Sequence, residues 1–256
     1  MKPLNSIISE VKSESPQIRT FRLDIDLDPA PGQYVMVWIR GVDEVPMSFS
    51  GPDTITVQSV GEATQSLFGM GAGRCIGLRG PLGNGFVLRG EKVLLIGGGV
   101  GTAPLVFLGE QAKRAGVEVA SLIGFRSAED LIFQTRFEAL GDTIVTTDDG
   151  SVGTKGRVAE GLSELDLGEF SQIYLCGPEP MMWDIISRTK EHAGKTQACI
   201  NRYFKCAIGI CGSCCIDPEG TRACVEGPVI MADRLLEGEF GRYKRGPTGG
   251  KQLCRG

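Results

Sequence analysis

The sequence of 256 residues contains a single histidine, His192, and shows no excess of basic residues. One histidine cannot supply a three-histidine zinc site or the two-histidine side of a Rieske cluster. Lys and Arg number 27 against 31 Asp and Glu, so the net charge is −4. Because nucleic-acid-binding proteins normally carry a basic stripe or a basic excess, this composition argues against nucleic acid as a partner.

Long hydrophobic runs are also missing. The longest uncharged stretch, residues 93–109, is shorter than a membrane span and is broken by several glycines and a proline. The N-terminus has no apolar stretch of the kind found in a signal peptide. We therefore expect a cytoplasmic protein with no membrane segment. In that compartment, clustered thiols serve metal or redox chemistry more often than disulfides.

Glycine is abundant, at 37 of 256 residues, which is about 14% and roughly twice the usual share. Up to about residue 89, short segments of alternating or β-rich character are separated by turns rich in Gly and Pro. These segments, at 20–25, 33–39 and 54–60, predict a small antiparallel barrel.

From residue 90 the pattern changes. A continuous apolar run at 93–96, a helical stretch at 104–115 and a strand at 117–124 predict a parallel sheet with covered faces, as do a strand at 173–176 and a helix at 180–191. After residue 196 neither period holds, and residues 242–256 predict a loosely ordered tail. We therefore expect an α+β multidomain protein with a barrel at 1–89, an α/β domain at 90–194 and a cysteine-rich domain at 195–256.

Six of the nine cysteines fall between residues 199 and 224. Four of them follow the spacing Cys-x4-Cys-x2-Cys with a fourth cysteine further on, which is typical of a plant-type [2Fe-2S] site. Zinc is the alternative, but zinc sites normally pair two short Cys-x-x-Cys units and only one is present. Cys215 directly follows a ligand and is predicted to be a bystander. The predicted ligands are Cys206, Cys211, Cys214 and Cys224.

Two further motifs predict a nucleotide site at the edge of the parallel sheet. A glycine loop follows the first buried strand and opens a helix, so its backbone can approach a pyrophosphate closely. It departs from Gly-x-Gly-x-x-Gly, and a purely structural turn is the alternative. The second motif, Cys-Gly-Pro, ends a later strand, where a thiol and a flat turn could pack against a nicotinamide ring. The residues are Gly97, Gly98, Gly99, Gly101, Thr102 and Pro104, with Cys176, Gly177 and Pro178.

Together these motifs resemble the ferredoxin–NADP⁺ reductase superfamily, in which a flavin barrel precedes a nicotinamide domain bearing Gly-Gly-Gly-x-Gly-x-Ala-Pro and Cys-Gly-Pro-x-x-Met. The cysteine motif after that domain narrows the resemblance to the family of electron-transfer subunits of type B dihydroorotate dehydrogenases, over essentially the whole chain. The resemblance implies FAD in the barrel, NAD(H) at the two nucleotide motifs and a [2Fe-2S] cluster on the cysteines.

By this resemblance the flavin site falls on two barrel strands and a following turn. Val45 stands where the family has an arginine, and the second strand lacks the usual Tyr-Arg pair. FAD is still required chemically, because a hydride carries two electrons and a [2Fe-2S] cluster accepts one. The residues implied to bind FAD are Pro46, Met47, Ser48, Thr56, Val57, Gln58, Gly61 and Thr64.

The implied function is an oxidoreductase subunit that passes electrons between NAD(H) and the FMN of a dihydroorotate dehydrogenase catalytic subunit. The path runs through FAD and the [2Fe-2S] cluster, in de novo pyrimidine biosynthesis, within a heterotetramer holding two copies of each subunit. No residue is assigned as a catalytic acid or base, because the cofactors carry the chemistry. NAD is preferred over NADP, although Arg126 and Ser127 after the second strand could accept a 2′-phosphate.

Two alternatives remain open at this point. The same architecture could belong to a sulfide dehydrogenase, an NADH-dependent ferredoxin–NADP⁺ oxidoreductase or a hydrogenase diaphorase. A non-catalytic iron–sulfur sensor that lost its flavin is the other class, and the replacement at Val45 is its only support.

Overall fold

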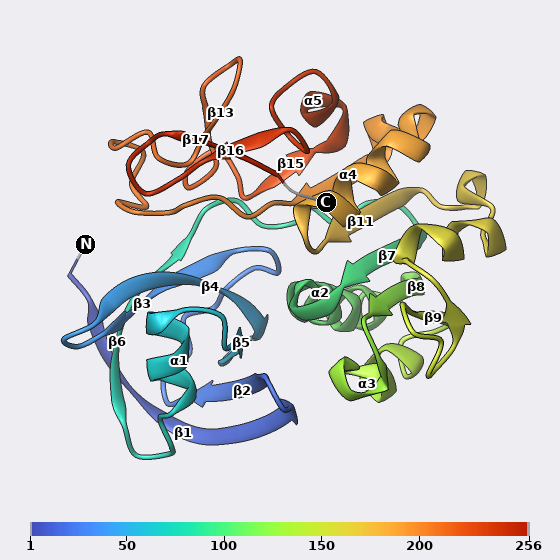
Figure 1. The fold of residues 1–256 in the computed structure, drawn as a ribbon. Coiled ribbons are helices and arrows are strands. Elements are labelled where there is room, and N and C mark those ends of the chain that lie inside the picture. The colour runs from blue at the N-terminus through green and yellow to red at the C-terminus, as the bar shows by residue number, and fades with distance from the viewer. Residues whose placement is uncertain (1, 255–256) are drawn as a thin grey trace.

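The computed structural model describes residues 2–254. Six antiparallel strands close into a barrel in the order β1-β2-β5-β4-β3-β6, the blue-to-cyan part of Figure 1. This closure confirms the predicted antiparallel barrel. Its elements are β1 (Leu4–Ser15), β2 (Ile18–Leu23), β3 (Tyr34–Ile39), β4 (Asp43–Gly51), β5 (Thr54–Gln58), helix α1 (Glu62–Phe68) and β6 (Cys75–Leu82).

Strand β3 is buried on both faces along most of its length. Val35 and Val37 point into the barrel core, as the two-residue period of a strand requires. Tyr34 and Met36 point outward, yet both are at most 2% exposed because the C-terminal part of the chain packs over them. Trp38, the next outward residue, is 39% exposed. The barrel therefore has a covered end and an open end along this strand.

The second unit is a seven-stranded sheet in the order β10-β9-β8-β7-β11-β12-β15. All of its neighbouring strands are parallel except β12 and β15, which confirms the predicted parallel-sheet fold. The apolar strand β7 is central and carries a buried core on each face. The strands are β7 (Lys92–Gly98), β8 (Glu118–Phe125), β9 (Thr143–Thr147), β10 (Thr154–Lys155), β11 (Gln172–Cys176), β12 (Thr196–Cys199) and β15 (Val229–Met231).

Helices cover both faces of this sheet. Helix α2 begins two residues earlier than expected, so Pro104 lies within its first turn, where its missing N–H costs no hydrogen bond. The α-helices are α2 (Thr102–Arg114), α3 (Gln134–Glu138) and α4 (Glu179–Arg188), and the 3₁₀ turns are η1 (Gly99–Gly101), η2 (Ala128–Asp130), η3 (Val158–Glu164), η4 (Leu167–Glu169) and η5 (Lys190–Lys195). No helix within residues 2–254 is long and apolar enough to cross a membrane.

The cysteine-rich segment lies across the top of both the barrel and the sheet in Figure 1. Its entry, β12, is a parallel strand of the sheet, and β15 pairs with it antiparallel, so residues 195–256 contribute two strands to the neighbouring unit. The segment also contains β13 (Cys215–Ile216), β14 (Thr221–Arg222), α5 (Ala232–Leu236), β16 (Tyr243–Arg245) and β17 (Lys251–Leu253).

The expectation of a loosely ordered tail at 242–256 is wrong for the described residues. Strands β16 and β17 form an antiparallel hairpin. Arg245 donates to both carboxylate oxygens of Asp217, at 2.9 and 3.0 Å, and the Tyr243 hydroxyl donates to the same carboxylate at 2.8 Å. These bonds hold a Gly- and Lys/Arg-rich segment whose composition alone indicates no order. Residues 255 and 256 of the expected tail lie outside the described residues.

Helix α2 also contributes to the barrel core, because Phe107 packs with Phe49 and Val57 and is only 2% exposed. Replacing Phe107 with alanine should leave a cavity there and lower the free energy of unfolding by about 3–5 kcal/mol, as measured by urea denaturation of the holoprotein. Val60→Ala, at a side chain that is 72% exposed, should cost less than about 0.5 kcal/mol. A loss below about 1 kcal/mol at Phe107 would mean that α2 and the barrel do not share a core.

Candidate cofactor sites

The glycine loop lies where β7 ends and α2 begins. The Thr102 hydroxyl donates to the carbonyl oxygen of Gly99 at 2.8 Å, which fixes the turn between strand and helix. Gly99 has a left-handed φ of +52°, and a Cβ built on it would meet nothing within 4 Å. The backbone at Gly99 therefore faces open space beside the first N–H groups of a 13-residue helix, as a pyrophosphate site requires.

The Cys-Gly-Pro turn contacts this loop directly. Strand β11 pairs with β7 so that Cys176 is opposite Gly97, at the carboxyl edge of the sheet. A Cβ on Gly101 would lie 2.6 Å from Cα of Gly177, so only glycine allows the loop and the turn to touch. The structure thus brings together two motifs that are about 75 residues apart, at the sheet edge where nucleotides bind in α/β folds.

The Cys176 thiol faces inward instead of lining the open edge. It is 8% exposed and lies opposite Cys199 of β12, and the neighbouring Cys199 thiol together with burial raises the pKa of Cys176 well above its ordinary value. The thiol therefore stays protonated and neutral. Any contact of this turn with a nicotinamide ring falls to the backbone and to Gly177 and Pro178.

Three side chains expected at the flavin site are already engaged. The Thr56 hydroxyl donates to Ser50 Oγ at 2.8 Å, and Val57 is fully buried in the barrel core. The Thr64 hydroxyl accepts the Gly61 N–H at 2.9 Å and so caps the start of α1. These three positions can offer FAD only their backbone atoms. The half-buried residues Pro46, Met47, Ser48 and Gln58 and the exposed Gly61 remain accessible.

Strand β4 supports a flat ligand on the barrel. Five consecutive residues of this strand, 44–48, are all half-buried, whereas a strand with one covered face alternates between buried and exposed. That pattern fits a strand whose outer side is partly open to a planar group. The residues present therefore fit a flavin beside Ser48, without the arginine that Val45 replaces.

Residues 206–214, here called the cysteine loop, turn sharply around the Cys206 sulfur. Ala207 and Gly209 have left-handed φ values of 56° and 77°, and the N–H groups of Ile210 and Cys211 each donate to Cys206 Sγ at 3.4 Å. Burial opposes ionisation of this thiol, but the backbone N–H groups outweigh it and lower the pKa of Cys206 to about 6. The loop therefore favours a thiolate, which is the form that binds iron.

The other three cysteines lie near one another. Burial is the main cause that raises the pKa of Cys214 to about 12, and the neighbouring thiols of Cys224 and Cys211 add to it. A metal removes this penalty because it replaces the protons of crowded thiols. No three His, Cys, Asp or Glu side chains within residues 2–254 have the spacing of a preformed single-ion site. The fit to an iron–sulfur cluster therefore rests on the loop, its amides and the gathered thiols.

The barrel contacts the backbone of two predicted iron ligands, and sequence reasoning missed both contacts. The buried Tyr34 hydroxyl donates to the carbonyl oxygen of Cys224 at 3.0 Å, and its ring lies 4.7 Å from that of Phe204. Arg79 of β6 donates to the carbonyl oxygen of Cys206 at 3.1 Å. These partners are 127 and 190 residues apart in the chain, so no local pattern indicates them.

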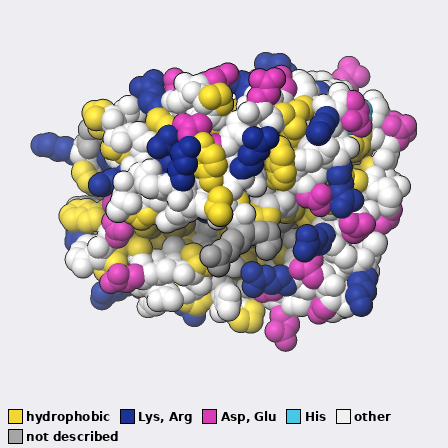
Figure 2. Space-filling view, turned by 45° about the horizontal axis from the view of Figure 1, so that its top comes forward, with side chains coloured by type: hydrophobic (Ala, Val, Ile, Leu, Met, Phe, Trp, Pro, Cys, Tyr) yellow, Lys and Arg dark blue, Asp and Glu magenta, His cyan; other side chains and the backbone are white. Residues whose placement is uncertain are grey.

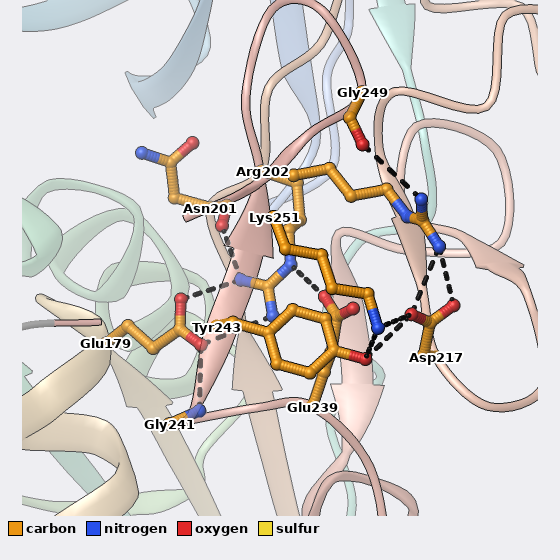
Figure 3. A network of polar contacts seen from close by, with 10 residues as sticks. Glu179, Asn201, Arg202, Asp217, Glu239, Gly241, Tyr243, Gly249 and Lys251 are labelled. Carbon is orange, nitrogen blue, oxygen red and sulfur yellow. Dashed lines mark hydrogen bonds and ion pairs between the residues drawn. The ribbon is translucent and has the colours of Figure 1, made fainter. Parts of the chain in front are cut away.

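A buried charge network ties the Cys-Gly-Pro turn to the cysteine loop (Figure 3). Arg202, fully buried, donates to the two oxygens of Glu179 at 2.7 and 3.3 Å and to Glu239 at 3.2 Å. Glu179 follows the turn directly and also accepts the Gly241 N–H at 2.8 Å. Because Arg202 precedes Cys206 by only four residues, one arginine holds the nucleotide turn and the start of the cysteine loop together.

Two segments of the chain match known domain families. Residues 201–236 match the iron-sulfur cluster binding domain of dihydroorotate dehydrogenase B, and residues 95–186 match the oxidoreductase NAD-binding domain. The first match covers all four predicted ligands, and the second covers both nucleotide motifs.

Full-length relatives extend these matches. A protein of Methanocella arvoryzae named "Probable dihydroorotate dehydrogenase B (NAD(+)), electron transfer subunit" is 52% identical over 256 residues, 98% of this chain and 99% of its own. This chain belongs to the dihydroorotate dehydrogenase B electron transfer subunit family. A relative of the same name from Methanocaldococcus jannaschii is 42% identical over 252 residues, 98% of each chain.

Solved structures agree with this family's fold. The chain is similar to an NADH-dependent reduced ferredoxin-NADP oxidoreductase studied for electron bifurcation, with a TM-score of 0.82 and 26% identity over 92% of this chain and 90% of that one. It also resembles a ferredoxin NADP⁺ reductase from Neisseria gonorrhoeae solved with FAD and NADP. There the TM-score is 0.64 and the identity 21%, over 75% of this chain and 92% of that one, which shows the fold alone.

Alanine in place of Cys206, Cys211, Cys214 or Cys224 should abolish the visible absorption and the reduced-state EPR signal of a [2Fe-2S] cluster, because each change removes one thiolate. Cys215→Ala is the matched control and should keep both, since Cys215 sits on β13 opposite Arg222, outside the loop. Two irons per chain and an unchanged EPR signal in Cys224→Ala would contradict the ligand set.

Gly99→Ala should raise KM for NADH about tenfold, equal to about 1.4 kcal/mol of binding, because its methyl group enters the open space beside the helix N-terminus. Steady-state NADH oxidation with an artificial acceptor measures it. The left-handed backbone adds a stability loss of about 1–2 kcal/mol. Gly41→Ala has the same strain (φ +79°) and open surroundings on the β3–β4 turn, so it should lose stability and keep KM. Equal KM values for the two variants would place the pyrophosphate elsewhere.

Proposed function

We propose that this chain carries electrons between NAD(H) and the catalytic subunit of a dihydroorotate dehydrogenase B, a reaction of pyrimidine biosynthesis. One arrangement carries the proposal. Two predicted iron ligands, Cys224 and Cys206, contact the barrel through Tyr34 and Arg79, while the nucleotide loop opens at the edge of the adjoining sheet. The chain is 52% identical to a family member. The three proposed cofactor sites thus belong to one continuous chain whose parts pack on one another.

When bound, FAD exchanges an electron pair with NAD(H) and single electrons with a [2Fe-2S] cluster, which connects a two-electron carrier to a one-electron path. The chain's own residues bind and orient these groups. We assign NAD(H) to Gly97, Gly98, Gly99, Gly101, Thr102, Pro104, Cys176, Gly177 and Pro178. We assign FAD to Pro46, Met47, Ser48, Thr56, Val57, Gln58, Gly61 and Thr64, and the irons to Cys206, Cys211, Cys214 and Cys224.

The sheet edge supports NAD as the nucleotide. Arg126 directly follows β8, and the N–H of Asp149, in the loop after β9, donates to the Arg126 carbonyl oxygen at 3.2 Å. Asp148 and Asp149 are both exposed at this position. The backbone contact brings two acidic residues to the same sheet edge as the single arginine, and their charge disfavours a 2′-phosphate more than a ribose hydroxyl.

We assign the oxidation of dihydroorotate itself to a separate FMN-containing subunit, with two copies of each chain in a heterotetramer. Removing a proton from carbon requires a positioned base, and the assigned residues of this chain bind cofactors instead. The cysteine loop offers the docking face, because Ile208 and Ile210 on it are 54% and 80% exposed. Figure 2 shows hydrophobic side chains interspersed with charges of both signs on the face that includes the cysteine-rich segment.

The NADH-dependent ferredoxin-NADP oxidoreductase is the second candidate, because it shares this fold over 92% of the chain. Its 26% identity is half of that to the Methanocella relative, so the dehydrogenase subunit is favoured.

The holoprotein should oxidise NADH with artificial acceptors on its own and should not oxidise dihydroorotate. Mixing it with the FMN subunit should give dihydroorotate-dependent NAD⁺ reduction, followed as NADH absorbance. The reason is that the nucleotide site and the dihydroorotate site reside on different chains. Activity with dihydroorotate from this chain alone would contradict the proposal, and stable binding only to a different redox subunit would favour the second candidate.

A matched pair of variants tests the docking face in the same assay. Ile210→Glu should raise the Kd for the FMN subunit and leave NADH oxidation by the isolated chain unchanged. Leu253→Glu changes a side chain that is equally exposed, at 80%, on β17, and should bind the subunit normally.

A further inference from the structure

Arg79 reaches from barrel strand β6 to the cysteine loop. Its side chain is 11% exposed, and its Nη1 donates to the carbonyl oxygen of Cys206 at 3.1 Å. Its Nε and Nη2 donate to the two carboxylate oxygens of Glu44 at 3.0 and 2.7 Å. A bidentate pair of this kind fixes the plane of the guanidinium. A permanent positive charge is therefore held in one orientation against the backbone of a proposed iron ligand.

The ion pair is directional with respect to the loop. Glu44 lies on β4 and Arg79 on β6, the two strands that flank β3, where Met36 is buried beneath the cysteine-rich segment. The Glu44 side chain is more exposed, at 26%, and its only side-chain hydrogen bonds among the described residues go to Arg79. The positive member of the pair therefore contacts the loop, whereas the negative member makes no hydrogen bond to it among the described residues and is more exposed to solvent.

A positive charge placed in this way changes the electron affinity of a cluster bound in the loop. Reduction of a [2Fe-2S] cluster adds one negative charge, so a nearby cation stabilises the reduced form more than the oxidised form. Screening by water is weak for a side chain that is nearly buried. Glu44 opposes the same field from further out and so offsets part of it.

We propose that Arg79 raises the reduction potential of the cluster and positions its loop, and that Glu44 moderates this effect. The inference rests on the cluster ligands given in the proposed function. Its consequence is that the barrel, which is assigned the flavin, also sets the electron affinity of the cluster. The residue touches the loop backbone and acts on the cluster through its charge.

The test is an EPR-monitored redox titration of the holoprotein. Arg79→Gln should lower the cluster potential by about 59 mV, which corresponds to a tenfold change in the equilibrium of a one-electron couple. Arg79→Lys keeps the positive charge, so its cluster potential should stay close to that of the unmodified protein. Glu44→Gln should move the potential the opposite way, to a higher value. Arg40→Gln is the matched control, because Arg40 lies on the same barrel but bonds Asn5 at 2.6 Å, and it should not shift the potential.

The opposite signs separate a charge effect from a structural one. A loosened loop would displace the potential in the same direction in Arg79→Gln and Glu44→Gln, and that result would overturn the inference, as would no shift in either. If Arg79→Gln does not retain the cluster, Glu44→Gln decides: a higher potential supports the inference, and a lower or unshifted one overturns it. Absence of a [2Fe-2S] signal from the unmodified protein would overturn the proposed function as well, whereas a normal signal with unshifted variants overturns the inference alone.

Discussion

Burial of strand β3 on both of its faces is the constraint on which the rest of the structure depends. Its inward residues, Val35 and Val37, belong to the barrel core, and its outward residues, Tyr34 and Met36, belong to a core shared with the sheet and the cysteine-rich segment. One strand thus serves two hydrophobic cores. Because side chains in such cores are close-packed, the barrel and the cysteine loop cannot slide relative to each other without opening cavities.

This rigidity suits electron transfer, which needs fixed separations between carriers. The second fixed junction is α2, which packs on the sheet and sends Phe107 into the barrel. The third is Arg202, whose bonds to Glu179 and Glu239 join the nucleotide turn to the cysteine loop. Each of the three junctions uses a different type of contact: packing, an inserted ring and a buried ion pair.

Local patterns in the sequence were enough to predict the barrel, the parallel sheet, the glycine loop and the cysteine spacing, because each depends on residues close together in the chain. Strand β12 was not predicted, because its sequence Thr-Gln-Ala-Cys contains two polar residues. In the structure Gln197 is buried, and its side-chain amide is satisfied by the backbone of Val87. The amide accepts the Val87 N–H at 2.9 Å and donates to the Val87 carbonyl oxygen at 2.7 Å. That partner lies 110 residues away, and no local pattern encodes it.

The same limit applies at the candidate sites. The resemblance implied contacts for Thr56 and Thr64, but both hydroxyls are satisfied within the barrel. Tyr34 and Arg79 could not be found from spacing, because their partners belong to another part of the fold. The order of the tail likewise depends on Asp217, which binds both Tyr243 and Arg245.

The sharing of strands between the sheet and the cysteine-rich segment has a consequence for how such proteins can be divided. A chain cut before residue 196 would lose β12 and β15 together, and β11 would become an edge with unpaired backbone groups. In this chain the reductase part and the cysteine-rich segment therefore share one sheet and depend on each other for its edge. A cysteine-rich segment expressed alone would in turn hold β12 and β15 without the β11 strand on which β12 pairs.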